Sequence, residues 1–169
     1  ARTKQQEELA QRASGQTRRY AWDFDEYYDI FEADSQGGHL NNLTQAPGYD
    51  AEGSWSPDGT WIVFASNRHA YTASLSDAER AILARDPSFF IDIYRMRADG
   101  TQVQRLTQAP GYDGGPFFSP DGRQIVWRHF APDGATAEIW TMNLDGSQQR
   151  QLTHLGVMSW TPYFHPSGA

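Results

Sequence analysis

Acidic residues at repeated positions are the first candidates for chemistry. Asp50 and Asp113 end two copies of the phrase Gln-Ala-Pro-Gly-Tyr-Asp. Carboxylate oxygens are ligands that Ca²⁺ prefers, so such a pair would suit a cation at a channel mouth. Asp also closes turns by accepting hydrogen bonds from backbone amides, and no Asp-x-Asp-x-Asp-Gly loop is present. We therefore expect turn capping here, as at Asp58 and Asp121, and no bound metal.

Histidine, serine and glycine patterns of known catalytic sites are absent from the sequence. No His-Glu-x-x-His, Gly-x-Ser-x-Gly or phosphate-binding glycine loop occurs, and the chain has no Cys. Convergence of His69 and His129 in space is the one arrangement that the sequence leaves open. We predict a protein that is not an enzyme and that uses no cofactor.

Composition narrows the classes of partner. Lys and Arg total 14 and Asp and Glu total 21, so the net charge is −7. Binding of nucleic-acid phosphates needs clustered basic residues, and the only local run is Arg18-Arg19. No apolar run approaches the ~18 residues of a membrane span. We expect neither nucleic-acid binding nor a membrane span.

A repeated phrase reveals the elements that position these residues. Leu-Thr-Gln-Ala-Pro-Gly-Tyr-Asp begins at Leu43 and again at Leu106, and Ser-Pro-Asp-Gly follows both copies. Leu152-Thr153 begins a looser third copy. Between these turns lie short β-branched and aromatic runs, such as 61–66 and 124–130, which are typical of strands. Four such strands per unit of about 40–46 residues predict the blades of a β-propeller.

The predicted organisation is all-β. Residues 1–20 form an N-terminal helical or irregular segment, and residues 21–169 form a partial propeller of about three blades. Residues 67–90 are an insertion. Within it, Ser76–Asp86 has the capping pattern of a helix. Three blades do not close a ring, since closed propellers have about 4–8. We therefore expect a fragment, a partly ordered chain, or a ring completed by other chains. The repeats span about 28–66, 91–130 and 137–169.

The predicted loops sort onto two faces. The Gln-Ala-Pro-Gly-Tyr-Asp loops and the insertion fall on one face, whereas the Ser-Pro-Asp-Gly turns fall on the other. Binding residues concentrate on long, varied loops, so the first face is the candidate site. Aromatic residues within strands, such as Trp55 and Trp127, are expected to fill the spaces between blades. The candidate binding residues are Tyr49, Asp50, Arg68, His69, Tyr71, Tyr112, Asp113 and Trp160.

Three linked motifs carry a resemblance to a known family. WSPDGTWIVFASNR, IYRMRADGTQVQRLT and FFSPDGRQIVW resemble the WD40-like repeat of the TolB β-propeller family, from about Tyr28 to the end of the chain. The resemblance implies a periplasmic or secreted protein of a bacterial envelope that serves as a docking platform. The insertion also resembles propeller regions beside zinc-aminopeptidase-like domains.

Two functions follow from these observations. The favoured one is a non-catalytic scaffold that binds other proteins in the bacterial envelope or in a larger assembly. The alternative is an accessory propeller that gates substrates of a secreted or periplasmic hydrolase of the peptidase type. Flanking sequence would separate them, because a metal-binding peptidase pattern would favour the second.

Overall fold

Antiparallel sheets make up most of the protein. The computed structural model describes residues 24–168 and, nearer the N-terminus, Gln6, Leu9, Ala10, Ala13 and Ser14, so the predicted segment 1–20 lies almost wholly outside the described residues. A two-stranded sheet contains β1 (Phe31–Glu32) and β2 (Asn41–Asn42). One four-stranded sheet contains β3 (Asp50–Trp55), β4 (Trp61–Ser66), β5 (Asp92–Arg97) and β6 (Gln104–Arg105). The other contains β7 (Asp113–Phe118), β8 (Gln124–Phe130), β9 (Ala137–Asn143) and β10 (Arg150–Gln151).

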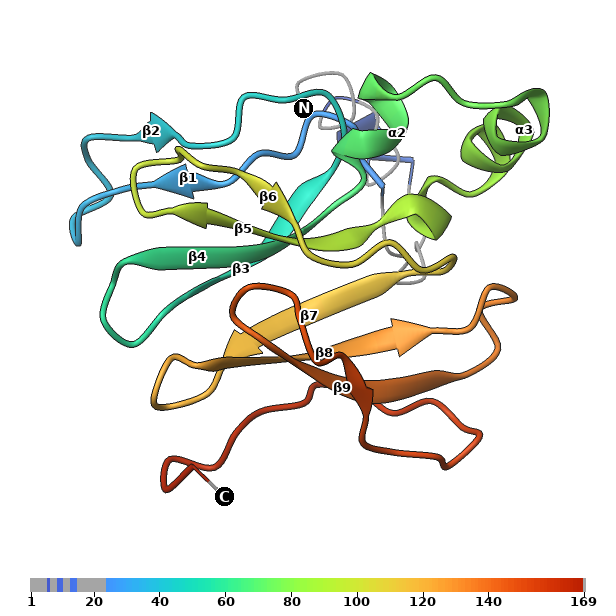
Figure 1. Ribbon diagram of the computed structural model, residues 1–169. Coiled ribbons are helices and arrows are strands. Elements are labelled where there is room, and N and C mark those ends of the chain that lie inside the picture. Colours follow the sequence, from blue (N-terminus) through green and yellow to red (C-terminus); the bar gives the residue numbers. More distant parts are fainter. Residues whose placement is uncertain (1–5, 7–8, 11–12, 15–23, 169) are drawn as a thin grey trace.

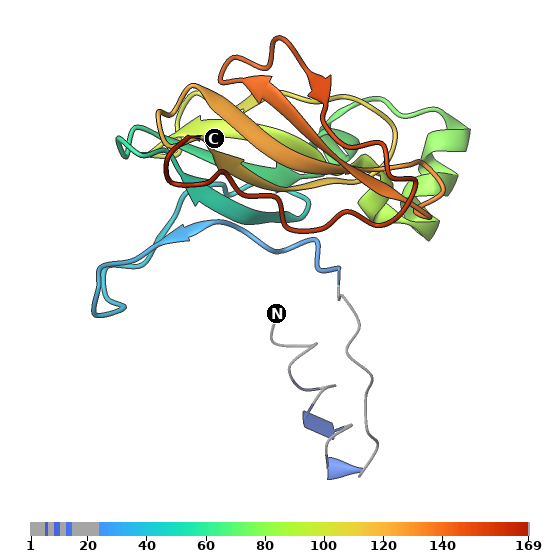
Figure 2. The same cartoon turned by 90° about the horizontal axis from the view of Figure 1, so that it is seen from below.

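The sheets follow one another as propeller blades. Figure 1 shows the β3–β6 sheet lying over the β7–β10 sheet, with the helices at one end and the β3–β4 and β7–β8 turns at the other. The same separation of ends is visible from below in Figure 2. Within the described residues the sheets remain open and do not close a ring. The predicted all-β class with four-stranded antiparallel blades is confirmed.

One main-chain hydrogen bond recurs at every junction between blades. At three equivalent positions of the repeat, an amide donates to a carbonyl that lies at the start of the third strand of the preceding unit or shortly before it. The bonds are Asp50 N to Tyr28 O (2.9 Å), Asp113 N to Ile91 O (2.9 Å) and Ser159 N to Ala137 O (2.8 Å). The repeated phrase therefore lies across a junction, and a predicted repeat such as 91–130 contributes strands to two sheets.

The Thr of each Leu-Thr dipeptide joins the third and fourth strands. Its hydroxyl accepts a hydrogen bond from the backbone amide of the Ile in the same repeat unit. The hydroxyl also donates a hydrogen bond to the carboxylate of the acidic residue that precedes this Ile. The hydrogen bonds from the Ile amides to the Thr hydroxyls are 2.9–3.0 Å long and join Ile30 to Thr44, Ile93 to Thr107 and Ile139 to Thr153. The acidic acceptors are Asp29, Asp92 and Glu138. This clamp is the physical reason for the spacing of Ile and Leu-Thr in the sequence.

The Ser-Pro-Asp-Gly turns form as the sequence predicts. Ser56 Oγ donates to Asp58 Oδ1 at 2.6 Å, and the amide of Trp61 donates to Ser56 Oγ at 2.9 Å. Ser119 and Asp121 repeat the first contact at 2.6 Å. The turn-capping role predicted for both Asp residues is confirmed.

The predicted helix in the insertion is also confirmed. The insertion contains α2 (Arg68–Thr72), α3 (Asp77–Arg85) and the 3₁₀ helix η1 (Pro87–Phe90). A capping box starts α3, since Ser76 Oγ accepts the amide of Glu79 while the Glu79 carboxylate accepts the amide of Ser76. In the described part of the chain, no helix has the length and apolar character needed to cross a membrane.

The main hydrophobic cluster joins the two four-stranded sheets. Val63 and Ile93 from the first sheet pack with Phe118, Ile125 and Trp127 from the second. The prediction that aromatic residues fill the space between blades holds for Trp127, which is 2% exposed. It is wrong for Trp55, which is 49% exposed because it ends β3 at the margin of its sheet.

Gly111 is required by the path of the second Gln-Ala-Pro-Gly-Tyr-Asp loop. Its φ is +113°, and a Cβ there would lie 2.3 Å from the carbonyl oxygen of Phe130. We expect Gly111→Ala to lower the free energy of unfolding by at least about 1–3 kcal/mol, the typical cost of such backbone strain. Urea denaturation measures the loss. Gly134→Ala is the control, because the φ of Gly134 is +69° but no atom lies within 4 Å of where its Cβ would be. An equal loss of stability in both variants would contradict the clash at Gly111.

Candidate functional site

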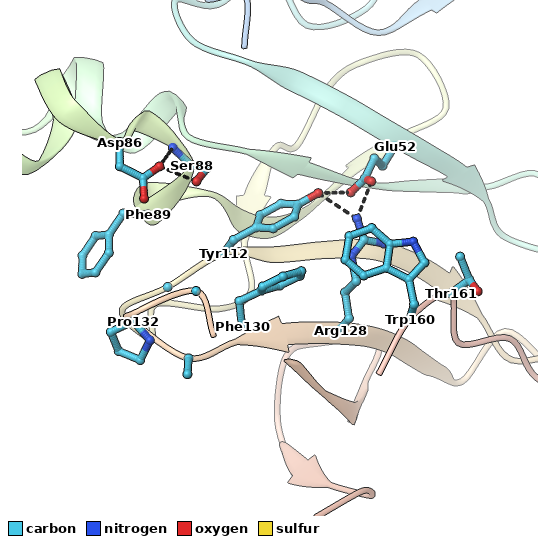
Figure 3. Close-up of a pocket in the computed structure, with 13 residues that line it drawn as sticks. Glu52, Asp86, Ser88, Phe89, Tyr112, Arg128, Phe130, Pro132, Trp160 and Thr161 are labelled. Atoms are coloured by element: carbon cyan, nitrogen blue, oxygen red, sulfur yellow. Dashed lines mark hydrogen bonds and ion pairs between the residues drawn. The ribbon is translucent and has the colours of Figure 1, made fainter. Parts of the chain in front are cut away.

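A pocket of about 630 Å³ opens at the helical end of the junction between the four-stranded sheets. Glu52 of β3 forms part of one side, and Arg128 and Phe130 of β8 form part of the other. The insertion contributes Phe89, and the segment after β10 contributes Trp160. Figure 3 shows these side chains converging from segments that are distant in the sequence. The pocket therefore exists only when the two blades and the insertion assemble.

A closed hydrogen-bond network forms the polar floor of the pocket. Arg128 Nη2 donates to Glu52 Oε1 at 2.7 Å and to the Tyr112 hydroxyl at 2.9 Å. The Tyr112 hydroxyl donates to Glu52 Oε2 at 2.7 Å, and the Gly115 amide donates to the same oxygen at 2.7 Å. Burial, and then the charge of Glu52, raises the pKa of Tyr112, which keeps its hydroxyl protonated as a donor. The Glu52 carboxylate is thus balanced by one cation and two further donors.

Glu52 occupies a strained backbone position that recurs in the next blades. Its φ is +56°, within a β-bulge between Ala51 and Ser54. The matching repeat positions, Gly115 and Thr161, have φ values of +58° and +47°. Left-handed backbone is costly for residues other than Gly, and such strain concentrates at functional sites. The bulge directs the Glu52 carboxylate across the junction to the Gly115 amide.

Aromatic rings form the walls above this floor. The Trp160 ring lies 4.4 Å from Arg128 Cζ, and its centroid lies 5.5 Å from that of Phe130 in an edge-on contact. The ring centroids of Tyr112 and Phe130 lie 5.2 Å apart. Trp160 nevertheless remains 55% exposed. The site therefore combines an electrically balanced floor with an accessible aromatic wall, an arrangement suited to binding an apolar group.

Two of the predicted binding residues, Tyr112 and Trp160, line the pocket. Asp50 and Asp113 lie at the start of β3 and β7 but are each only 1% exposed. The prediction that they cap backbone amides is wrong. Asp50 instead forms an ion pair with Arg68 Nη2 at 2.6 Å. Asp113 Oδ1 accepts hydrogen bonds from the side chains of Trp127 and His129.

The remaining predicted residues lie at the same end of the sheets but outside the pocket. Tyr49 is buried, with its ring 5.7 Å from Phe24 and 5.5 Å from Tyr28. Arg68 lies over Phe64, while His69 and Tyr71 are half-buried in α2. Their roles in binding stay predictions. Among the residues that the structure describes, no three His, Asp or Glu side chains are grouped to hold a metal ion.

Sequence reasoning missed Glu52, Arg128 and Phe130. Two signals in the repeats point to Glu52 and Arg128. Glu52 stands where the second copy has Gly115, and Arg128 interrupts an apolar strand where the first copy has Ala65. Charged residues at positions that are otherwise small or apolar indicate a partner across a junction, but the repeats alone do not identify that partner.

The fold and the site define the class of protein: a β-propeller with an aromatic-walled pocket at a blade junction. No family model matches the chain. The proteins to which it is similar nevertheless include TolB-type proteins, as the repeated motifs predicted. A TolB homolog of Chlorobium luteolum is 28% identical over 128 residues, which covers 60% of this chain and 28% of that protein. A solved structure from Agrobacterium tumefaciens, described as a TolB, superposes with a TM-score of 0.61 at 29% identity and covers 86% of this chain and 46% of that one.

A further likeness is to an enzyme. Dipeptidyl-peptidase 5 of Porphyromonas gingivalis is 31% identical over 90 residues, which covers 51% of this chain but 11% of that protein. The chain thus spans less than a third of these two sequence relatives and less than half of the solved structure.

Proposed function

We propose that the protein is a non-catalytic propeller scaffold that binds another protein at the helical end of its blades. The observation that carries this proposal is Trp160, 55% exposed beside a pocket of about 630 Å³. In this arrangement an apolar side chain of the partner enters the pocket and packs against Trp160 and Phe130. Trp, Tyr and Arg are the residue types that dominate binding energy at protein interfaces.

The floor of the pocket supports an apolar anchor rather than a charged one. Arg128 and Glu52 already neutralise each other, and the Tyr112 hydroxyl is both a donor and an acceptor. A charged ligand would have to break this network, which costs more than it returns in a buried site. An aliphatic or aromatic side chain leaves the network intact and removes apolar surface from water.

Similarity to TolB-type proteins supports a place in a bacterial envelope. On this proposal the protein is periplasmic or secreted and acts as a platform in a larger assembly. The accessory propeller of a hydrolase is the alternative. It is less favoured because the peptidase match covers a smaller share of this chain than the TolB-type matches do.

A photo-crosslinking amino acid in place of Trp160 tests the proposal in the source bacterium. We expect a discrete adduct with a second protein, identified by mass spectrometry. The same amino acid in place of Trp55 is the matched control, because Trp55 is 49% exposed but lies at the opposite end of β3. Trp160→Ala should weaken co-purification of the identified partner at least about tenfold, the effect of losing an interface anchor.

Two outcomes would overturn the proposal. One is crosslinking from position 160 only within the chain, which would show that the pocket is covered by the protein itself. The other is an equal yield of the same adduct from position 55, which would show that the contact does not depend on this pocket.

A further inference from the structure

Two acidic residues, one from each four-stranded sheet, are buried where the blades meet. The amide of Asp113, the first residue of β7, donates to the carbonyl of Ile91 at 2.9 Å, and this bond places Asp113 next to Asp92 of β5. Asp92 is 2% exposed and Asp113 is 1% exposed. A buried carboxylate is costly to ionise without compensating charge.

The compensating charge at this junction is incomplete. Arg105 of β6 forms an ion pair with Asp92 Oδ2 at 2.6 Å. Asp113 Oδ1 accepts from Trp127 Nε1 at 3.0 Å and contacts His129 Nδ1 at 2.7 Å, whereas Asp113 Oδ2 is buried without a hydrogen-bond partner among the described residues. With a neutral His129, two negative charges face one permanent positive charge. One added proton would balance the cluster.

We propose that the Asp92–Asp113–His129 cluster is a proton-binding site that is occupied around neutral pH and that strengthens the junction of the two blades when it is occupied. Loss of the proton leaves a net negative charge in the buried junction, which favours separation of β5 from β7.

The electrostatics of the individual groups agree with this charge balance. Burial is the largest influence on Asp92 and raises its pKa to about 7, against an attraction from Arg105. The hydrogen bond to Asp113 raises the pKa of His129. Both groups hold a proton in the folded state at pH values where the unfolded chain releases it. Stability should therefore decrease as the pH rises from about 4 to 7 for Asp92, and from about 6.5 upward for His129.

The other charged groups around the cluster do not supply the missing charge. Burial, with the charge of Arg105, lowers the pKa of His69 in α2, so that imidazole is neutral at pH 7. Tyr94 of β5 stays protonated because burial raises its pKa to about 12.

The charged groups nearby are already paired. Glu138 lies opposite His129 in the strand register, but its carboxylate accepts hydrogen bonds from Thr153 and from the Gly156 amide. Asp50 and Arg68, which also act on Tyr94, neutralise each other.

The neighbouring junctions provide a comparison within the same chain. Asp29 occupies the position of Asp92 in the preceding unit, where Asn42 and Thr44 donate to its carboxylate. In the following unit, Ser159 occupies the position of Asp113. Asp50 occupies the position of Asp113 in the preceding junction, but it pairs with Arg68 at 2.6 Å, a cation that Asp113 lacks. Asp29 is therefore used as the control for Asp92.

Thermal unfolding between pH 6 and pH 8 tests the proposal. We expect the midpoint to fall by about 3–6 °C over this range, which corresponds to the release of about one proton from a chain of this size. Asp92→Asn, which imitates the protonated side chain, should remove the part of this fall that Asp92 contributes between pH 6 and about 7. Asp29→Asn should leave it unchanged. Differences between variants cancel the contributions of the other histidines, which are common to all of them.

An NMR titration of the His129 ring in the unmodified protein gives an independent measurement, with the signal assigned through its loss in His129→Ser. The expected result is a midpoint above the ordinary value for His. The proposal is overturned by a His129 midpoint at or below that value, or by an Asp92→Asn variant whose pH dependence equals that of Asp29→Asn.

Discussion

Trp127→Ala is expected to lower the free energy of unfolding by about 3–5 kcal/mol, the range for deleting a large buried aromatic side chain. Trp127 is 2% exposed and belongs to the cluster that joins the two four-stranded sheets. Its ring centroid lies 6.1 Å from that of Trp140, and its Nε1 donates to Asp113 Oδ1 at 3.0 Å. The substitution therefore opens a cavity and also removes a donor from a buried carboxylate. Urea denaturation followed by circular dichroism measures the loss.

Two further variants separate these causes. Trp127→Phe keeps most of the apolar volume but removes the hydrogen bond, so a smaller loss of about 1–3 kcal/mol is expected. Trp55→Ala removes the same side chain from a site that is 49% exposed, and should cost less than about 1 kcal/mol. If Trp127→Ala were no worse than Trp55→Ala, the two sheets would not share the core described above.

Arg128→Met should lower the free energy of unfolding by about 2–4 kcal/mol. The Arg128 side chain is 6% exposed, and its removal leaves the Glu52 carboxylate without its cation. The loss from breaking a buried ion pair reaches about 3–5 kcal/mol, and partial exposure of Glu52, at 27%, reduces it. The contact with the Trp160 ring disappears as well, so the pocket wall should loosen together with its floor. Denaturation in urea measures the stability, and Trp fluorescence reports the environment of the ring.

An exposed ion pair in the turn between β7 and β8 is the control for Arg128. Arg123 Nε lies 4.0 Å from Asp121, with side chains that are 86% and 61% exposed. Arg123→Met should therefore change stability by no more than about 0.5 kcal/mol. Combining Arg128→Met with Glu52→Gln should cost less than the sum of the two separate losses, since both disrupt one interaction. Strict additivity would show that the pair does not couple the blades.

Local patterns in the sequence predicted the blades because each depends on neighbouring residues. The turn at Ser56 is closed by Asp58 two positions later, and the helix α3 begins with a contact between Ser76 and Glu79. Repetition then supplied the relation between units, because Leu43 and Leu106 mark the same place in successive copies. The alternation of strands and turns follows from these short-range signals.

The pocket depends instead on contacts between distant residues. Glu52 meets Arg128 across 76 positions, and neither residue belongs to the repeated pattern. Asp50 was assigned to turn capping because its partner, Arg68, is positioned by an insertion whose path the sequence does not specify. Tyr112 and Trp160 were identified because they lie on the loop face itself. The sequence thus indicated the end of the molecule at which this pocket lies, but not the pairing that builds it.

The amide-to-carbonyl bond repeated at Asp50, Asp113 and Ser159 has a bearing on how such chains grow during evolution. Both bonded atoms belong to the backbone, so a duplicated unit brings its own attachment point whatever its side chains are. Tandem duplication or loss can then change the number of units without inventing a new docking surface. The side chains at each attachment point are left free to diverge, and Asp113 and Ser159 already differ in chemical character.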